Sequence, residues 1–222
     1  MANRLTTKDR ILNAAERLFA ERGFSETSLR LITSKAEVNL ASVNYHFGSK
    51  KELIQAVLAR YLDHSMPAMH KELEALAKRP TLELQDVFEA MVTPLMSVNQ
   101  VRQNGTAIFL QLLGRGYIES QGHLRWFVTT HHGDVLSYMS TLVHRAAPHV
   151  SPVEVFWRLH FTLGTLVFTM SSFDALADIA QADYDQSNDV ESVLRRIIPY
   201  LAAGVAAPMP QFAAQPEAVF GN

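Results

Sequence analysis

The chain has 222 residues, of which 48% are hydrophobic and 19% charged, so it is long enough for one or two globular domains with a sizeable core. It contains no cysteine, which excludes a disulfide framework, thiolate chemistry and a zinc–thiolate site. The charged start over residues 1–9, and the lack of an apolar run of the roughly 20 residues that a membrane span needs, predict a cytoplasmic protein with no secretory signal and no membrane partner.

The first predicted element is an amphipathic helix over residues 7–22, which Gly23 ends. Its apolar side chains recur at helical spacing and form one stripe, made of Ile11, Leu12, Ala15, Leu18 and Phe19. Residues 1–60 as a whole contain ten Lys and Arg against six Asp and Glu, whereas the rest of the chain contains ten against sixteen. Such an excess of positive charge is expected of a segment that meets phosphate.

Two short helices joined by a tight turn are predicted next. Thr27 can cap the first, over residues 28–36, because its hydroxyl can accept a hydrogen bond from an amide of the first turn. The turn falls at residues 37–38. Asn39 is a good cap for the second helix, over residues 40–47.

The second of these helices presents a surface that suits a DNA major groove. Val43 and Phe47 point inward four residues apart, which leaves small, hydrogen-bonding and aromatic side chains on the other faces: Ala41, Ser42, Asn44, Tyr45 and His46. Asn can pair with adenine through two hydrogen bonds, Ser can donate or accept, and Ala can contact a thymine methyl group. An aromatic hydroxyl or an imidazole can reach a phosphate or a base edge.

A third helix opens directly after this unit. Ser49 and Glu52 form a capping box, which places Lys50 and Lys51 in the first turn. Lysines are unusual at a helix N-terminus, where the helix dipole is already positive, and a bound phosphate would account for both. The alternative is that they are ordinary solvated lysines on a small helical domain. Pro67 is predicted to break or kink this helix.

Residues 11–53 strongly resemble the DNA-binding domain of the TetR family of bacterial transcriptional regulators, through I-L-N-A-A-E-R-L-F-A-E-R-G-F at residues 11–24 and the whole stretch of residues 27–53. The resemblance implies that the chain binds double-stranded DNA at a palindromic operator. The candidate DNA-binding residues are Thr27, Ser28, Ala41, Ser42, Asn44, Tyr45, His46 and Lys50. Glu37 departs from the family, which usually carries glycine in the turn, and needs either a different local conformation or an accepted strain cost.

The rest of the chain is predicted to be helical, with no alternating strand pattern. We expect helices over residues 81–96, 106–119 and 123–147, a fourth from residue 151 with apolar residues as far as 173, and a last helix opened by a capping box at residues 188–191. Pro94 and Pro199 are expected to bend the helices that contain them. The tail from residue 207, rich in Ala, Pro and Gln, is predicted to be disordered.

Two glycines, Gly114 and Gly116, fall inside the helix predicted over residues 106–119. Each costs up to about 1 kcal/mol relative to alanine, so together they indicate a close backbone approach, a bend, or room for a ligand. A helix end near Gly114 is an equal alternative.

Further motifs resemble the PsrA-type, fatty-acid-responsive subgroup of the same family: L-R-L-I-T-S-K-A, V-N-Y-H-F-G-S-K-K, S-Q-G-H-L-R at residues 120–125 and F-W-R-L-H-F at residues 156–161. The resemblance implies a small-molecule effector such as a long-chain fatty acid or acyl-CoA. The candidate ligand-binding residues are Phe109, Leu113, Tyr117, Trp126, Arg158 and Phe161.

A carboxylate head group also needs a polar partner, because leaving it unpaired away from water is costly. Arg125, Arg158, His123 and His160 are the candidates. For each aromatic residue core packing is the alternative role, and for Arg158 and His160 it is a buried structural hydrogen bond.

The last two long helices are the candidates for a homodimer interface. The resemblance implies that they pair with their copies across a two-fold axis in a four-helix bundle, which presents two recognition helices to a palindromic operator about one turn apart. The alternative is that they complete a monomeric core.

No motif indicates catalysis, a metal or a cofactor. The chain has nine histidines, but none forms H-E-x-x-H, and the adjacent pair His131 and His132 would point about 100° apart on a helix. There is no G-x-S-x-G, P-loop or Rossmann glycine pattern. We therefore do not expect an enzyme.

The sequence thus predicts an all-α protein with a three-helix helix-turn-helix DNA-binding domain over residues 1–50, a helical ligand-binding and dimerisation domain over 51–206 and a tail over 207–222. The predicted function is that of a ligand-responsive transcriptional regulator, a repressor that its effector releases from the operator. The alternative is a helical small-molecule-binding protein without DNA binding, which Glu37 keeps open.

Overall fold

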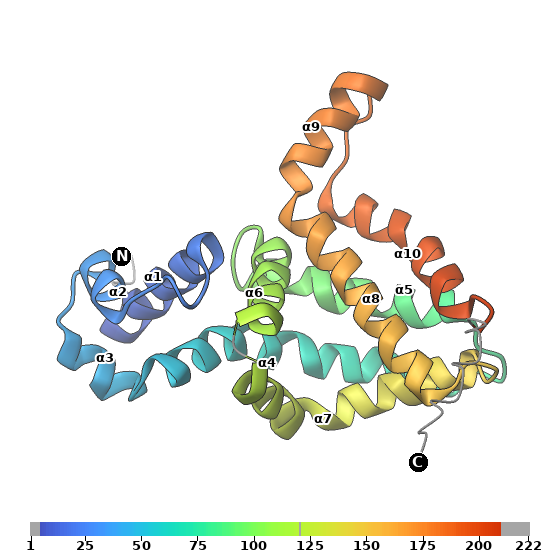
Figure 1. The fold of residues 1–222 in the computed structure, drawn as a ribbon, viewed down its shortest axis with the longest axis horizontal. Helices are drawn as coiled ribbons and strands as arrows, with labels where there is room; N and C mark the ends of the chain where they lie inside the picture. Colours follow the sequence, from blue (N-terminus) through green and yellow to red (C-terminus); the bar gives the residue numbers. More distant parts are fainter. Residues whose placement is uncertain (1–4, 120, 210–222) are drawn as a thin grey trace, which may run out of the picture.

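The structure, a computed structural model, describes residues 5–119 and 121–209. Within these ranges the chain forms ten α-helices and one short 3-10 helix and no strand, which confirms the predicted all-α fold. In chain order they are α1 (Thr7–Arg22), α2 (Leu29–Ala36), α3 (Leu40–Phe47), α4 (Lys50–Ala77), α5 (Leu84–Ser97), the 3-10 helix η1 (Val98–Gln100), α6 (Gly105–Glu119), α7 (Gln121–Ala146), α8 (Pro152–Ser171), α9 (Phe173–Tyr184) and α10 (Val190–Ala206). Helices α1 to α3 form a small group at one end, and α4 runs from it into a larger body (Figure 1).

The small group follows the sequence prediction closely, because its helix caps are local. Helices α1 and α3 have the predicted bounds, and the Asn39 side chain caps α3 through a backbone N–H at 2.8 Å. Helix α2 is capped by Ser28 and not by Thr27, so it begins one residue later than predicted. Thr27 is buried, and its hydroxyl donates to the carbonyl oxygens of Gly23 at 2.7 Å and Leu18 at 3.2 Å.

The predicted stripe of α1 and the inward pair of α3 are buried, and Ile32 and Ala36 of α2 are buried with them. The predicted residues are Ile11, Leu12, Ala15, Leu18, Phe19, Val43 and Phe47. They belong to the same hydrophobic cluster as the buried side chains of α4, α5 and α6. The small group is therefore packed onto the larger body and not merely tethered to it.

The central helix α4 has 28 residues, which corresponds to about 42 Å. It continues through Pro67, so of the predicted break or kink at this proline the break was wrong. Helix α5 begins at Leu84, behind a capping box formed by Glu83 and Asp86, and it continues through Pro94. Helix α4 packs against both α5 and α7 and so lies at the centre of the larger body.

Helix α6 continues past both of its glycines to Glu119, so the alternative of a helix end near Gly114 was wrong. A Cβ added to Gly114 would lie 2.5 Å from Cγ1 of Val167, which confirms that this glycine permits a close approach, here between α6 and α8. Helix α7 spans nearly the predicted range, but its backbone is non-helical at His132, with φ −136° and ψ 18°. This break was not predicted.

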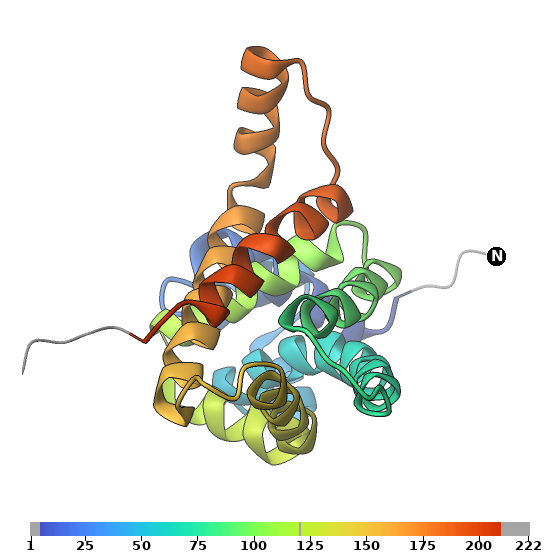
Figure 2. The same cartoon turned by 90° about the vertical axis from the view of Figure 1, so that its right-hand side faces the viewer.

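The C-terminal part contains one helix that the sequence analysis missed. Helix α9 has no buried residue and projects away from the body, beyond the end of α8 (Figures 1 and 2). Helix α10 is capped by Asp189 with Ser192, and not by the predicted box at residues 188–191, and it continues through Pro199. No single described helix is long and apolar enough to cross a membrane. Among the described helices only α8 and α9 taken together reach that length and apolar content, and they are bent by 70° at their junction.

The predicted tail begins as an ordered segment. The Arg158 guanidinium donates to the carbonyl oxygens of Val205 at 2.7 Å, Ala207 at 2.6 Å and Pro208 at 3.2 Å. Residues 207–209 are therefore held against α8, and the rest of the predicted tail, residues 210–222, lies outside the described residues.

The turn between α2 and α3 contains the residue at which the sequence departs from the expected glycine. Glu37 adopts the left-handed conformation, with φ 53° and ψ 49°, and its backbone N–H bonds to the carbonyl oxygens of Thr33 and Ser34. The helix therefore ends as it would with glycine, at a conformational cost of about 1–2 kcal/mol for a residue with a Cβ. The sequence left two possibilities for Glu37, a different local conformation or a strained left-handed one, and the structure has the strained left-handed conformation.

We predict that Glu37→Gly raises the free energy of unfolding by up to about 1 kcal/mol. Glycine relieves the left-handed strain, and its greater freedom in the unfolded chain takes back part of the gain. Urea denaturation of the two proteins measures the difference. Glu37→Ala is the matched control, since it removes the charge and keeps the Cβ. Equal stabilisation by both substitutions would assign the effect to the charge and contradict the prediction.

Candidate nucleic-acid interface and ligand cavity

The first candidate site is the outer surface of α3. Val43 and Phe47 are buried, and α3 packs against α1, α2 and α4, so the opposite face is turned to solvent. Tyr45 is 86% exposed, although a large aromatic side chain gains by burial, and its ring meets the ring of His46 edge-on at 5.1 Å. Ala41 and Asn44 are also exposed.

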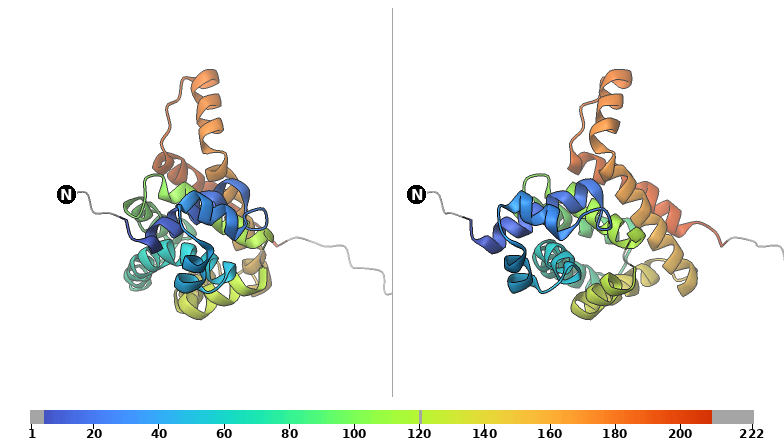
Figure 3. Two further views of the ribbon diagram at one scale, coloured as in Figure 1. Left: turned by 90° about the vertical axis from the view of Figure 1, so that its left-hand side faces the viewer. Right: turned by 60° about the vertical axis from the view of Figure 1, so that its left-hand side comes forward.

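The neighbouring helix ends extend this surface. Ser28 at the start of α2 is exposed, and its hydroxyl accepts from the backbone N–H of Leu31 at 3.1 Å. Lys50 at the start of α4 places its Nζ 3.5 Å from the carbonyl oxygen of Ser25, in the loop before α2. The structure thus brings together a hydroxyl, a cation and the face of α3 at one end of the molecule, the end turned to the viewer in the left panel of Figure 3.

Seven of the eight candidate DNA-binding residues lie at least partly on this surface: Ser28, Ala41, Ser42, Asn44, Tyr45, His46 and Lys50. Thr27 does not, because its hydroxyl points into the core of the small group. The sequence misled here because two consecutive hydroxyl residues precede α2, and either can cap a helix.

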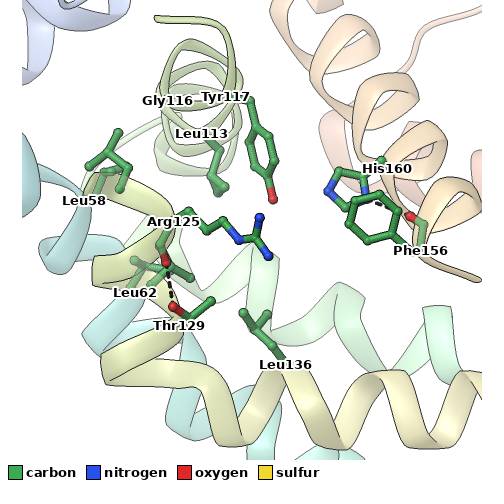
Figure 4. A pocket seen from close by; sticks show the side chains of 12 residues that line it. Leu58, Leu62, Leu113, Gly116, Tyr117, Arg125, Thr129, Leu136, Phe156 and His160 are labelled. Carbon is green, nitrogen blue, oxygen red and sulfur yellow. Dashed lines mark hydrogen bonds between the residues drawn. The ribbon is translucent and has the colours of Figure 1, made fainter. Parts of the chain in front are cut away.

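The second candidate site is a cavity of about 400 Å³ between α4, α6, α7 and α8 (Figure 4). Most of its wall is apolar and consists of Leu58, Leu62, Leu113, Gly116, Leu124, Val128, Leu136 and Phe156. Its polar side chains are Tyr117, Arg125, Thr129 and His160. This combination of an apolar wall with a few polar groups is typical of small-molecule sites.

The polar groups differ in how well the protein itself satisfies them. The Thr129 hydroxyl donates to the carbonyl oxygen of Arg125 at 2.9 Å. The Nδ1 of His160 lies 2.7 Å from the carbonyl oxygen of Phe156, which leaves Nε2 for another partner. The Arg125 guanidinium extends toward the Tyr117 hydroxyl (Figure 4), and no hydrogen bond or ion pair joins it to the residues that the structure describes. Arg125 is therefore the cation available to a ligand.

The structure assigns different roles to most of the candidate ligand residues. Leu113 and Tyr117 line the cavity as predicted. Phe109 is buried in the core, where its ring stacks on Tyr61 with centroids 5.4 Å apart. Trp126 and Phe161 are exposed and do not line the cavity.

Arg158 does not line the cavity either, and the structure shows the alternative role that the sequence left open for it, a buried structural hydrogen bond. It is 7% exposed, and besides the three carbonyl oxygens at the end of α10 it pairs with Glu154 at 3.3 Å. Of the other head-group candidates, Arg125 and His160 line the cavity, and His123 does not. Burial lowers the pKa of His123, and the charge of Lys51 adds to this effect.

A third feature is an exposed apolar stripe on α8. It consists of side chains that recur at helical spacing, Val153, Trp157, Phe161 and Phe168. The single chain leaves this stripe uncovered, with Phe161 64% exposed. Tyr200 of α10 is exposed as well. An exposed apolar area of this kind marks an interaction surface.

The described residues contain no group of three or more His, Asp and Glu side chains that could hold a metal ion. His132 lies 3.7 Å from Asp63 at the break in α7, and His131 contacts the carbonyl oxygen of Phe127 through Nδ1 at 2.9 Å. The two adjacent histidines thus face different groups, a carboxylate and a backbone carbonyl oxygen.

Two family models match the chain. The model described as "Bacterial regulatory proteins, tetR family" matches residues 11–57, and the model described as "Tetracyclin repressor-like, C-terminal domain" matches residues 89–204. The second match alone covers more than half of the chain.

Curated relatives match over shorter segments. The probable HTH-type transcriptional regulator YttP of Bacillus subtilis (strain 168) is 31% identical over 90 residues, which is 40% of this chain and 44% of that protein. The HTH-type transcriptional regulator UidR of Escherichia coli (strain K12) is 24% identical over 110 residues, which is 50% of this chain and 52% of that protein. The chain thus spans about half the length of these relatives.

Solved structures share the fold over almost the whole chain. Mycobacterium smegmatis AmtR matches with a TM-score of 0.56 and 16% identity, covering 93% of this chain and 89% of that one. A HlyIIR mutant with residues 170–185 substituted by alanine matches with a TM-score of 0.58 and 17% identity, covering 94% and 100%. At these identities the likeness shows the fold.

Proposed function

Because the chain belongs to the TetR family of bacterial regulatory proteins, we propose that it is a ligand-responsive transcriptional repressor that binds a palindromic operator as a homodimer. Proteins of this family are regulators and not enzymes, which supports the expectation from the sequence. The observation that carries the proposal is the presence, in one chain, of the exposed α3 surface and a separate apolar cavity. We place the boundary between the two functional domains near residue 50, at the start of α4.

The α3 surface offers the groups that DNA recognition requires. Asn44 and Ser42 supply hydrogen-bonding groups for base edges, and Ala41 supplies a methyl group. Tyr45 is exposed to solvent, while Lys50 and Ser28 flank the helix where phosphates would lie. The surplus of positive charge in residues 1–60 supports this orientation.

The apolar stripe on α8 supports the homodimer. A two-fold axis places a surface against the same surface of a second copy, so one stripe serves both partners. Helices α8 and α10 cross on this side of the molecule (Figure 2), and they would form the four-helix bundle that the family resemblance implies. Helix α9, which has no buried residue in the single chain, stands at the edge of the same side.

The cavity supports an effector with an apolar body and an anionic head, for which a long-chain fatty acid or its acyl-CoA is our candidate. This assignment follows the resemblance to the PsrA-type subgroup, with Arg125 in the head-group role in place of Arg158. A guanidinium binds a carboxylate through two parallel hydrogen bonds, and Tyr117 and His160 face the same space. To move the protein from mostly DNA-competent to mostly released, the effector needs roughly 10⁴-fold preference for the released state.

The test of the proposal is binding of the protein to duplexes from its own upstream region, at about 50 and 200 mM salt, with and without dodecanoate. We expect tight binding that weakens steeply with salt, because lysine and arginine contacts release counterions from phosphates. Tyr45→Ala should weaken operator binding at least about tenfold at both salt concentrations, and Lys50→Ala should also reduce the salt slope by about 1.

Matched controls for these variants are Tyr184→Ala and Lys78→Ala, which remove an exposed tyrosine and an exposed lysine elsewhere. Unchanged affinity in both Tyr45→Ala and Lys50→Ala would overturn the proposed docking of α3. Failure of the unmodified protein to bind any selected duplex would leave only the alternative, a helical small-molecule-binding protein without DNA binding.

We predict that Phe161→Glu converts the dimer into a monomer. Two carboxylates would then meet across the axis in an apolar interface, where a desolvated like-charge pair is strongly unfavourable. Sedimentation equilibrium should show a mass near the chain mass of 24.8 kDa in place of twice that value. Ile179→Glu on α9 tests whether the effect is specific to the stripe. A Phe161→Glu protein that remains a dimer at the same concentration would exclude α8 from the interface.

We predict that Arg125→Met weakens binding of dodecanoate about tenfold or more, because the carboxylate loses its charge-assisted hydrogen bonds. Dodecanol has a twelve-carbon alkyl chain with a hydroxyl group in place of the carboxylate. Its affinity should be the same for the unmodified protein and for Arg125→Met. Titration calorimetry measures both ligands. Arg196→Met, which removes an exposed arginine from α10, should leave both affinities unchanged. An equal loss of dodecanoate and dodecanol affinity in Arg125→Met would show that the residue shapes the cavity and does not bind the head group.

A further inference from the structure

The loop between α1 and α2 contacts the larger body at the last turn of α6. The backbone N–H of Ser25 donates to Oε2 of Glu119, the last residue of α6, at 2.7 Å. A hydrogen bond from an amide to a carboxylate is charge-assisted and roughly twice as strong as a neutral one. The Glu119 side chain is 14% exposed, so the bond is partly shielded from water. It joins residues that are 94 positions apart in the chain.

The loop is adapted to this carboxylate. Gly23 has φ 86°, in the region that favours glycine, and a Cβ added to it would overlap the Glu119 carboxylate. The carbonyl group of Ser25 has a different partner: the Nζ of Lys50 lies 3.5 Å from its oxygen. Glu119 and a candidate DNA contact therefore hold the same loop residue from two sides.

The same turn of α6 forms part of the cavity. Gly116 and Tyr117 line it, and Tyr117 extends from this turn into the open space (Figure 4). The ring of Phe24, in the loop, comes within 4.0 Å of the position that a Cβ of Gly116 would occupy. Arg115 steadies the turn through an ion pair with Glu119 at 3.6 Å. A molecule that displaces this turn from the cavity side must also move Glu119.

We propose that Glu119 is the positioning residue through which occupancy of the cavity reaches the DNA-reading helices. An occupant shifts the last turn of α6, the bond from Ser25 to Glu119 weakens, and the loop that sets the start of α2 becomes free to move. This inference rests on the proposed function, because the link regulates DNA binding only if the protein is a ligand-responsive regulator. The physical link itself is open to test on the free protein, without DNA.

The test uses hydrogen exchange of the Ser25 amide, followed by NMR. Glu119→Ala removes the acceptor and should accelerate this exchange about tenfold or more. Val128→Phe fills the cavity from α7 and stands in for an occupant. It should accelerate Ser25 exchange in the protein with Glu119 and have no further effect in the Glu119→Ala background.

Two results would overturn the link. One is Ser25 exchange that does not respond to Val128→Phe in the protein with Glu119. The other is an equal response with and without Glu119. If circular dichroism shows that Val128→Phe does not fold, Leu113→Trp fills the same cavity from α6.

A second arm separates this link from the proposed function. The factor by which dodecanoate changes operator affinity should fall at least about fivefold in Glu119→Ala, and it should not change in Asp174→Ala, which removes a carboxylate from α9. Glu119-dependent exchange in a protein that binds no duplex would keep the link and remove the regulator function. Release by dodecanoate that is the same with and without Glu119 would keep the regulator and remove the link.

Discussion

The ion pairs of the Glu16 carboxylate are the interaction on which the placement of the small group, α1 to α3, against the larger body depends. Glu16 lies on α1, is completely buried, and pairs with Arg60 of α4 at 3.0 Å and with Arg102, which follows η1. A buried charge is tolerated only when its partners stay in place, since losing one leaves an uncompensated ion away from water. Burial raises the pKa of the neighbouring Tyr61 phenol, and the charge of Glu16 adds to this, so the tyrosine contributes no further charge. This network therefore has to break before the small group can separate from α4 and from the segment between η1 and α6.

Helix α1 is thus held by the larger body at two places that differ in strength. In its middle, Glu16 is fixed by two arginines within a buried network. Just beyond its C-terminal end, the loop at Ser25 is held by a single hydrogen bond to Glu119, within reach of water. A displacement that arises in the larger body would break the single hydrogen bond between Ser25 and Glu119 before it broke the buried ion pairs of Glu16, because the hydrogen bond costs less free energy to break. The small group would accordingly turn about the Glu16 network, with the movement taken up by the loop, which fits a change in the separation of two α3 helices across a dimer.

The parts of the fold that the sequence predicted are those that local chemistry determines. Asn39 marks the start of α3, and the stripe of α1 predicts its buried face, because caps and helical periodicity act within a few residues. What it missed depends on distant partners. For Arg158 the sequence leaves both a ligand contact and a buried structural hydrogen bond open, because nothing near it shows that carbonyl oxygens almost 50 positions away need donors. Helix α9 was missed because it buries no side chain in the single chain. The break in α7 at His132 was missed although Gly133 follows it directly, since a single glycine inside an apolar helical pattern does not by itself show a break.

The two glycines of α6 show how one helical turn can serve several purposes. Gly114 lets Val167 of α8 approach, so the helix that carries the exposed apolar stripe rests directly on α6. Gly116, two residues later, lies at the cavity wall and beside Phe24 of the small group. The proposed dimer helix, the cavity and the loop before α2 therefore all meet this short segment, which ends at Glu119. Because the three surfaces converge within about one and a half turns, coupling between them needs only a small shift of this segment, and the packed core around α4 can stay as it is.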